Sequence, residues 1–139
     1  MNQVFRRRHN HKGFTLIELL VVVLILGILL AVAIPLYLSS VKNSATETSK
    51  ANCKTIAQAA QAYKVKNGAY PADLATMTGS GKDLEQVPAG PRGVTYSFAP
   101  GTGDIGVVTA TEGGQDAFNT TATNEAATYT ISTGAYSGF

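Results

Sequence analysis

Hydrophobic residues are concentrated in one uninterrupted segment near the start of the chain, residues 14–38. No charged residue occurs between Leu19 and Leu38. Twenty residues of α-helix span roughly 30 Å, about the hydrocarbon thickness of a bilayer. The pattern therefore predicts a helix that can cross a membrane or pack among other apolar helices. Pro35 predicts a kink or local melting near residues 31–35, because proline removes one backbone hydrogen bond and crowds the preceding turn.

The helical pattern continues beyond the proline, but its apolar residues then occupy one face only, which predicts an amphipathic helix over residues 39–67. Asn67-Gly68 is a suitable end for this helix, and Lys64 and Lys66 suit its negative terminus. The residues predicted to share the apolar face are Leu38, Val41, Ala45, Asn52, Ile56, Ala59, Ala60 and Tyr63.

Short elements and turns make up the remainder of the chain, residues 68–139. Glycine and proline mark a turn at residues 68–74 and a loop over residues 78–93. Three strands are predicted from apolar alternation, with the register of the second left open, and they cover residues 94–98, 104–110 and 127–133. The predicted fold class is α+β: a long N-terminal helix, membrane-spanning in its first half, packed on a small antiparallel β-sheet head.

The distribution of charge matters more than the formal total of +2. Four of the eleven basic residues, Arg6, Arg7, Arg8 and Lys12, precede the apolar segment. Without residues 1–13, seven basic residues stand against nine acidic ones, a balance of about −2. Bulk charge therefore does not favour nucleic-acid binding. The basic cluster indicates a cytoplasmic N-terminus under the positive-inside rule.

Glu18 is a lone carboxylate at the start of the apolar segment. Such a group is costly in a membrane helix, and it is by default a functional candidate that needs a partner. Cleavage after Gly13 would create that partner, because the new amine of Phe14 would lie one helical turn from Glu18.

The sequence KGFTLIELL, followed by VVVLILGILLAVAIP, resembles the N-terminus of type IV pilins and of type II secretion pseudopilins. The resemblance is close over residues 12–38 and looser as far as Pro71. It implies cleavage between Gly13 and Phe14 by a prepilin-type peptidase, with N-methylation of Phe14. It also implies an assembly role for Glu18, which would pair with the Phe14 amine of a neighbouring subunit.

The resemblance implies a structural subunit rather than an enzyme. Residues 1–13 would be a cytoplasmic leader, 14–38 the membrane and filament-core half of the helix, 39–67 its amphipathic half, and 68–139 the head. The expected partners are further copies in a helical filament, the inner membrane before assembly, the peptidase and the assembly machinery. The expected destination is an extracellular pilus, serving adhesion, motility or DNA uptake, or a periplasmic pseudopilus. Nucleic acid enters only through DNA uptake.

Two alternatives remain open at this point. The chain could be a major pseudopilin of a type II secretion system, since its head is short and lacks a cysteine pair. It could instead be a secreted globular domain behind an ordinary signal peptide, because Ala31-Val32-Ala33 satisfies a small-residue cleavage rule and would leave Ile34 as the first residue. Glu18 argues against this second alternative, because it would lie at the start of the signal's apolar region.

No catalytic constellation is found in the sequence: there is no phosphate-binding glycine loop, zinc-ligand spacing or nucleophile elbow. No cofactor is expected. Cys53 is the single cysteine, so no internal disulfide can form, and its place near the apolar face predicts a buried, inert thiol. Acidic loop residues are weak calcium candidates, although solvated charges are the favoured interpretation, and they are Asp104, Glu112 and Asp116.

Overall fold

The computed structural model describes residues 13–103, 105–113, 118 and 126–139. The chain divides into two compact units between Tyr37 and Leu38. One helix, α1 (Leu16–Asn67), accounts for nearly all of the described first unit and continues into the second. It ends at the position that the Asn67-Gly68 pair predicts. Gly68 has φ +81° and donates its N–H to the carbonyl of Lys64, as in a left-handed helix stop.

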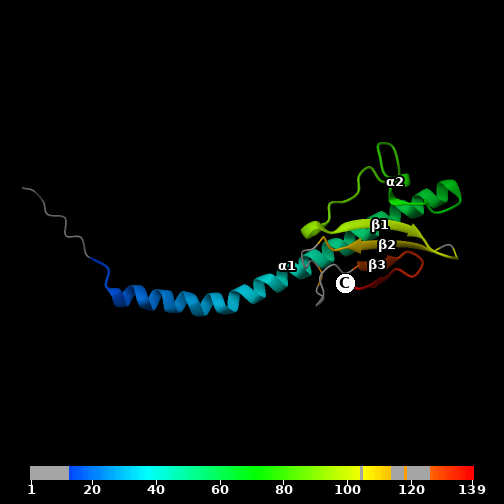
Figure 1. Cartoon of the computed structure of the whole chain (residues 1–139). Coiled ribbons are helices and arrows are strands. Elements are labelled where there is room, and N and C mark those ends of the chain that lie inside the picture. Colours follow the sequence, from blue (N-terminus) through cyan, green and yellow to red (C-terminus); the bar gives the residue numbers. More distant parts are fainter. Residues whose placement is uncertain (1–12, 104, 114–117, 119–125) are drawn as a thin grey trace, which may run out of the picture. The chain divides into compact units, whose positions relative to one another are not determined.

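The second unit contains a four-stranded antiparallel sheet in sequential order, β1-β2-β3-β4. The strands are β1 (Thr95–Pro100), β2 (Gly106–Thr111), β3 (Ala126–Thr130) and β4 (Ala135–Ser137). Two short helical pieces precede them, α2 (Leu74–Met77) and the 3-10 helix η1 (Pro91–Gly93). Figure 1 shows β1, β2 and β3 lying side by side along the second half of α1. The expected α+β fold, with a long apolar helix and an antiparallel sheet, is confirmed.

The buried stripe of α1 is built from small side chains, which let the sheet approach the helix closely. Cys53, Ile56 and Ala60 are fully buried, and they share one core with Phe98 and Val108 of the sheet. The further core members include Ala57, Ala59, Met77, Leu84, Val94, Ala110, Phe118, Ala127 and Ile131. Removing this apolar surface from water supplies the main stabilisation of the head.

The predicted helix face is correct from Ala45 onward and wrong at its beginning. Leu38 is 53% exposed, because no described element of the sheet covers the helix there. Asn52 lies on this face because its amide makes hydrogen bonds there. It donates to the carbonyl of Ala89 at 3.2 Å and to the Tyr96 hydroxyl at 3.0 Å. The helix is thus joined to the edge strand β1 by one hydrogen bond, to Tyr96, as well as by apolar contact.

The three predicted strands are present as β1, β2 and β3, and the structure adds a fourth strand at the C-terminal end. In β2 the open register is settled by the burial of Val108 and Ala110, with Val107 on the other face. The third strand ends at Thr130 instead of continuing to residue 133, since residues 131–134 form a turn. Gly134, with φ +65°, completes that turn and leads into β4, a strand that the sequence pattern did not predict.

Candidate functional site

The N-terminal end of α1 is organised by Thr15 and Glu18. Helix α1 begins at Leu16, so Thr15 is its N-cap residue and Glu18 is the third helical residue. One carboxylate oxygen of Glu18, Oε2, accepts hydrogen bonds from the Thr15 backbone N–H at 2.9 Å and from the Thr15 hydroxyl at 2.6 Å. The Glu18 N–H in turn donates to Thr15 Oγ1 at 3.3 Å. This reciprocal arrangement is a capping box, and it satisfies two of the backbone donors that every helix N-terminus leaves free.

Thr15 is a functional residue that is not among the candidates from the sequence. The signal was nonetheless present, because threonine followed three residues later by glutamate, before an apolar run, is the sequence signature of a capping box. The interpretation of Glu18 as a charge that needs a partner is therefore refined. In the isolated chain, its carboxylate has a partner within its own helix terminus.

Phe14 and Glu18 lie around the same shallow hollow at this end of the helix. Its lining is almost entirely apolar apart from the carboxylate, and it comprises Phe14, Ile17, Glu18, Val21 and Val22. The Phe14 side chain is 78% exposed. Gly13, Phe14 and Thr15 precede the helix without regular structure, and all three are exposed. The Gly13–Phe14 peptide bond is thus accessible, while the carboxylate one turn away is already held in place.

The apolar part of α1 is uncovered in the isolated chain. Every residue from Leu16 to Leu38 is exposed, and the helix has a window of mean hydropathy 3.2 of which none is buried. Its length and composition are sufficient to cross a membrane. An exposed apolar surface of this length has to be covered by lipid or by other protein.

Helix α1 continues without interruption through Pro35. The expectation of local melting near residues 31–35 is therefore wrong for the isolated chain. Proline removes a single hydrogen bond, and the flanking turns, rich in leucine and isoleucine, retain theirs. The alternative outcome, a kink at Pro35, stays a prediction.

The weak calcium candidates are not gathered into a site in the described part of the chain. Asp104 and Asp116 lie outside the described residues. Glu112 is 4% exposed, and its Oε1 accepts the backbone N–H of Phe118 at 2.6 Å, so this oxygen already has a protein partner. Within residues 13–103, 105–113, 118 and 126–139, no three metal-ligating side chains form a cluster.

Cys53 is a buried free thiol, as predicted. Burial raises the pKa of the Cys53 thiol to about 11, because an apolar surrounding disfavours the thiolate. A thiol of this kind is a poor nucleophile and redox group at neutral pH. A disulfide between subunits would require the head to open.

The chain is similar to known proteins, and one family model matches the same end of the chain. A family model described as the prokaryotic N-terminal methylation motif matches residues 8–34. The chain is 38% identical over 112 residues to the type II secretion system core protein G of Pseudomonas aeruginosa, covering 69% of this chain and 79% of that protein.

Two further relatives carry pilus names. The chain is 36% identical over 89 residues to the type IV wide pilus major component PilA4 of Thermus thermophilus, covering 64% of each protein. It is 37% identical over 68 residues to the type IV major pilin protein PilA of Myxococcus xanthus, covering 49% of this chain and 31% of that protein. No solved structure matches the chain significantly.

Proposed function

Since this chain belongs to the family of type IV pilins and type II secretion pseudopilins, we propose that it is the major structural subunit of a type IV pilus, built by packing the Leu16–Leu38 part of helix α1. The observation that carries the proposal is the combination of a fully exposed apolar helix with one carboxylate, Glu18, held at its first turn. An ordinary membrane anchor needs the apolar surface but has no need of the carboxylate.

Processing is the first step of the proposed assembly. A prepilin-type peptidase would cleave the exposed Gly13–Phe14 bond and leave Phe14 as the first residue, to be N-methylated. The new α-amine is largely protonated at neutral pH, since such groups titrate near pH 8. Cleavage therefore places a cation at an apolar helix end. An amine of this kind is a suitable partner for a carboxylate in a medium of low dielectric.

Pairing between subunits is the second step. Glu18 of one subunit would accept hydrogen bonds from the Phe14 amine of its neighbour, adding to or replacing the Thr15 bonds that hold the carboxylate in the isolated chain. Each ion loses hydration in the filament core, and the pairing offsets part of that loss. A subunit added out of register would leave a buried charge without its partner, so the pair selects the axial register.

Transfer from membrane to filament is the third step. Before assembly the subunit would cross the inner membrane once, with its basic leader in the cytoplasm. The apolar half of α1 exchanges lipid for other helices, and both surroundings are apolar, so the hydrophobic free energy changes little. Gly27, Ala31 and Ala33 permit close helix approach. Pro35 is a weak point at which the helix can bend in the filament. The mechanical work would come from the assembly machinery.

A second candidate function, the major pseudopilin of a type II secretion system, is favoured by one observation. Of the three relatives described above, the one that is matched over the largest share of its own length, 79%, is named a type II secretion core protein. Deletion of the gene from its natural host separates the two candidates. Loss of surface filaments with normal secretion is expected for the pilin, whereas loss of secretion with filaments retained would support the pseudopilin.

The filament proposal itself is tested by the N-terminus of the mature protein. Intact-mass and N-terminal peptide analysis of protein purified from cells is expected to show a chain that begins with methylated Phe14. A chain that begins at Ile34 would contradict the proposal, because that result would identify an ordinary signal peptide and remove most of the apolar helix.

A further inference from the structure

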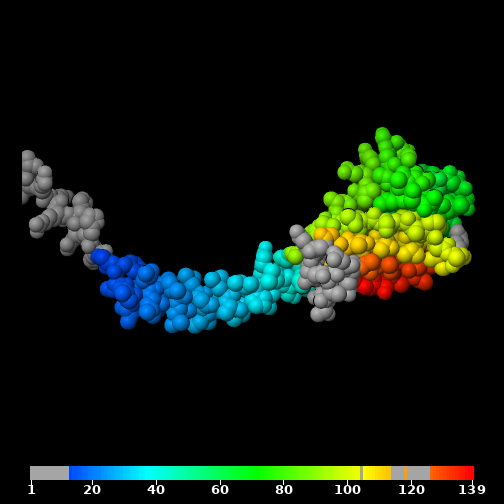
Figure 2. Space-filling view, viewed as in Figure 1, coloured from blue at the N-terminus to red at the C-terminus, as the bar shows by residue number. Residues whose placement is uncertain are grey.

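The C-terminal strand of the head is weakly held within the sheet. Strand β4 is three residues long and pairs only with β3, through Thr130↔Ala135, Tyr129↔Tyr136 and Thr128↔Ser137. All three of its residues are exposed. Figure 2 shows the C-terminal residues, in red, along one edge of the head. An edge strand this short contributes few hydrogen bonds, so its position depends on contacts outside the sheet.

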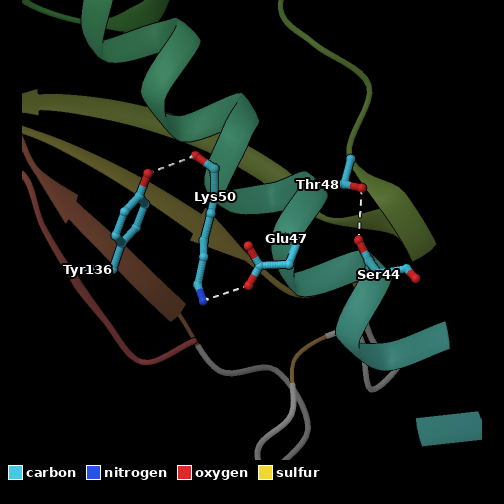
Figure 3. A network of polar contacts seen from close by, with 5 residues as sticks. All are labelled: Ser44, Glu47, Thr48, Lys50 and Tyr136. Carbon is cyan, nitrogen blue, oxygen red and sulfur yellow. Dashed lines mark hydrogen bonds and ion pairs between the residues drawn. The ribbon is translucent and has the colours of Figure 1, made fainter. Parts of the chain in front are cut away.

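Those contacts converge on one turn of helix α1. The Tyr136 hydroxyl donates to the backbone carbonyl of Lys50 at 3.3 Å, across 86 positions of sequence. The Lys50 ammonium lies 6.0 Å from the Tyr136 ring centroid and 5.8 Å from that of Phe139. Glu47, one turn earlier, holds the same ammonium at 3.0 Å. Figure 3 shows Tyr136 pointing toward the Lys50 backbone while the Lys50 side chain reaches Glu47.

A chain of aromatic rings connects this segment with the core. The Tyr129 and Tyr136 rings are 4.7 Å apart, the Tyr136 and Phe139 rings 5.6 Å, and the Phe139 and Phe118 rings 5.2 Å. Phe118 is fully buried, whereas Tyr136 is 39% exposed. The rings therefore run from the surface inward, and residues 135–139 cover one side of the core.

Cys53 belongs to the core against which Tyr129 and Phe139 pack. It follows Lys50 by three positions on α1 and is fully buried. The Tyr136 hydroxyl reaches the Lys50 carbonyl, and a carbonyl in a helix points toward the residues three and four positions later, so Tyr136 lies against the turn of α1 that holds Cys53. The C-terminal segment on this side of the core is held to the helix by noncovalent side-chain contacts alone.

We propose that residues 135–139 form a strap that closes over the helix at Lys50 and opens as a local unit before the rest of the head unfolds. A chain with one cysteine cannot fasten its C-terminal segment to the helix by an internal disulfide. Aromatic, cation–π and hydrogen-bond contacts fasten the strap instead. Opening the strap uncovers Cys53, so the rate at which this thiol is chemically modified reports the opening. The proposal does not depend on the filament function.

The test is the rate at which a maleimide modifies Cys53 in the full-length protein in detergent micelles, followed by intact mass. Removing a strap contact is expected to raise the labelling rate by about tenfold in Tyr136→Ala and by several-fold in Lys50→Ala. The control is Lys54→Ala, which removes an exposed lysine one turn further along the helix and is expected to label at the wild-type rate. Equal rates in Tyr136→Ala, Lys50→Ala and the wild-type protein would overturn the proposal.

A second measurement keeps the test valid even if a variant fails to fold. For the wild-type protein, the labelling rate is followed in increasing urea beside global unfolding by circular dichroism. Local opening exposes little surface, so the rate is expected to be nearly independent of urea below the unfolding transition. A rate that rises from the lowest urea concentration with the full slope of global unfolding would overturn the proposal.

Discussion

Glu18 is a residue whose role depends on its surroundings. In the isolated chain it completes a capping box with Thr15, and in the proposed filament it would serve a neighbour's amine as well. The sequence alone identified Glu18, because a single charge within an apolar run is conspicuous. Thr15 carries the sequence signature of a capping box with Glu18, but its role becomes plain only when the start of the helix is fixed at Leu16.

Replacing Glu18 by alanine is expected to leave membrane insertion intact and to lower the yield of sheared filaments at least about tenfold, since removing one partner of a buried ion pair leaves the other charge uncompensated. Glu18→Gln keeps a hydrogen-bond acceptor without the charge and is expected to fall in between. The control is Glu85→Ala, at an exposed carboxylate of the head. Filaments sheared from Glu18→Ala cells at the wild-type yield would refute the assembly role.

Asp73 offers a second test at this scale, through the pH dependence of head stability. Its Oδ1 accepts bonds from the Thr76 N–H at 2.8 Å and the Thr76 hydroxyl at 2.7 Å, and these bonds lower the pKa of the carboxyl. A lowered folded-state pKa stabilises the fold above the unfolded-state pKa, and this contribution is lost as the pH falls below about 4. Asp73→Ala should therefore lower the urea midpoint at pH 7 and lower it less near pH 2. An equal loss at both pH values would contradict the capping role.

At the scale of elements, the sequence predicted what periodicity controls and missed what distant contacts control. The end of α1 at Asn67 and the burial of Ile56 follow from local pattern and turn chemistry. Strand β4 could not be predicted that way. Its sequence, Ala135-Tyr136-Ser137, has no alternation of apolar residues, and its place depends on a contact to Lys50, far away in the chain.

The packing of α1 on the sheet gives a prediction of magnitude. Ile56→Ala is expected to lower the free energy of unfolding of the head by about 3 kcal/mol, because it removes a fully buried side chain and leaves a cavity. The matched control on the same helix is Val65→Ala, at a side chain that is 87% exposed, and it is expected to change stability by less than about 0.5 kcal/mol. Urea unfolding followed by circular dichroism measures both. Similar losses in the two variants would show that the helix does not pack as described.

At the scale of the whole molecule, two different surfaces of one helix serve two purposes. The stripe that begins at Ala45 is buried under the head's own sheet, whereas every residue from Leu16 to Leu38 is exposed in the described part of the chain. Burial of the first surface stabilises a folded domain, whereas the second surface has to be covered by lipid or by further copies. The apolar pattern of the sequence changes in the same direction, from all faces of the helix to one face.

The pilus or pseudopilus assignment could not be reached from the sequence in the same way. Under the proposal, both kinds of subunit would use the same helix, the same carboxylate and the same processing site. What separates them lies in contacts with other proteins, which neither the pattern of one chain nor its fold contains.

The most direct test of the account is the structure of filaments purified from cells that make this protein, at a resolution that shows side chains. We expect the Leu16–Leu38 helices to form the filament core, with the Glu18 carboxylate within hydrogen-bond distance, about 3 Å, of the Phe14 amine of a neighbouring subunit. Filaments in which the Glu18 carboxylate faces solvent, or in which the head alone makes the contacts between subunits, would contradict the account.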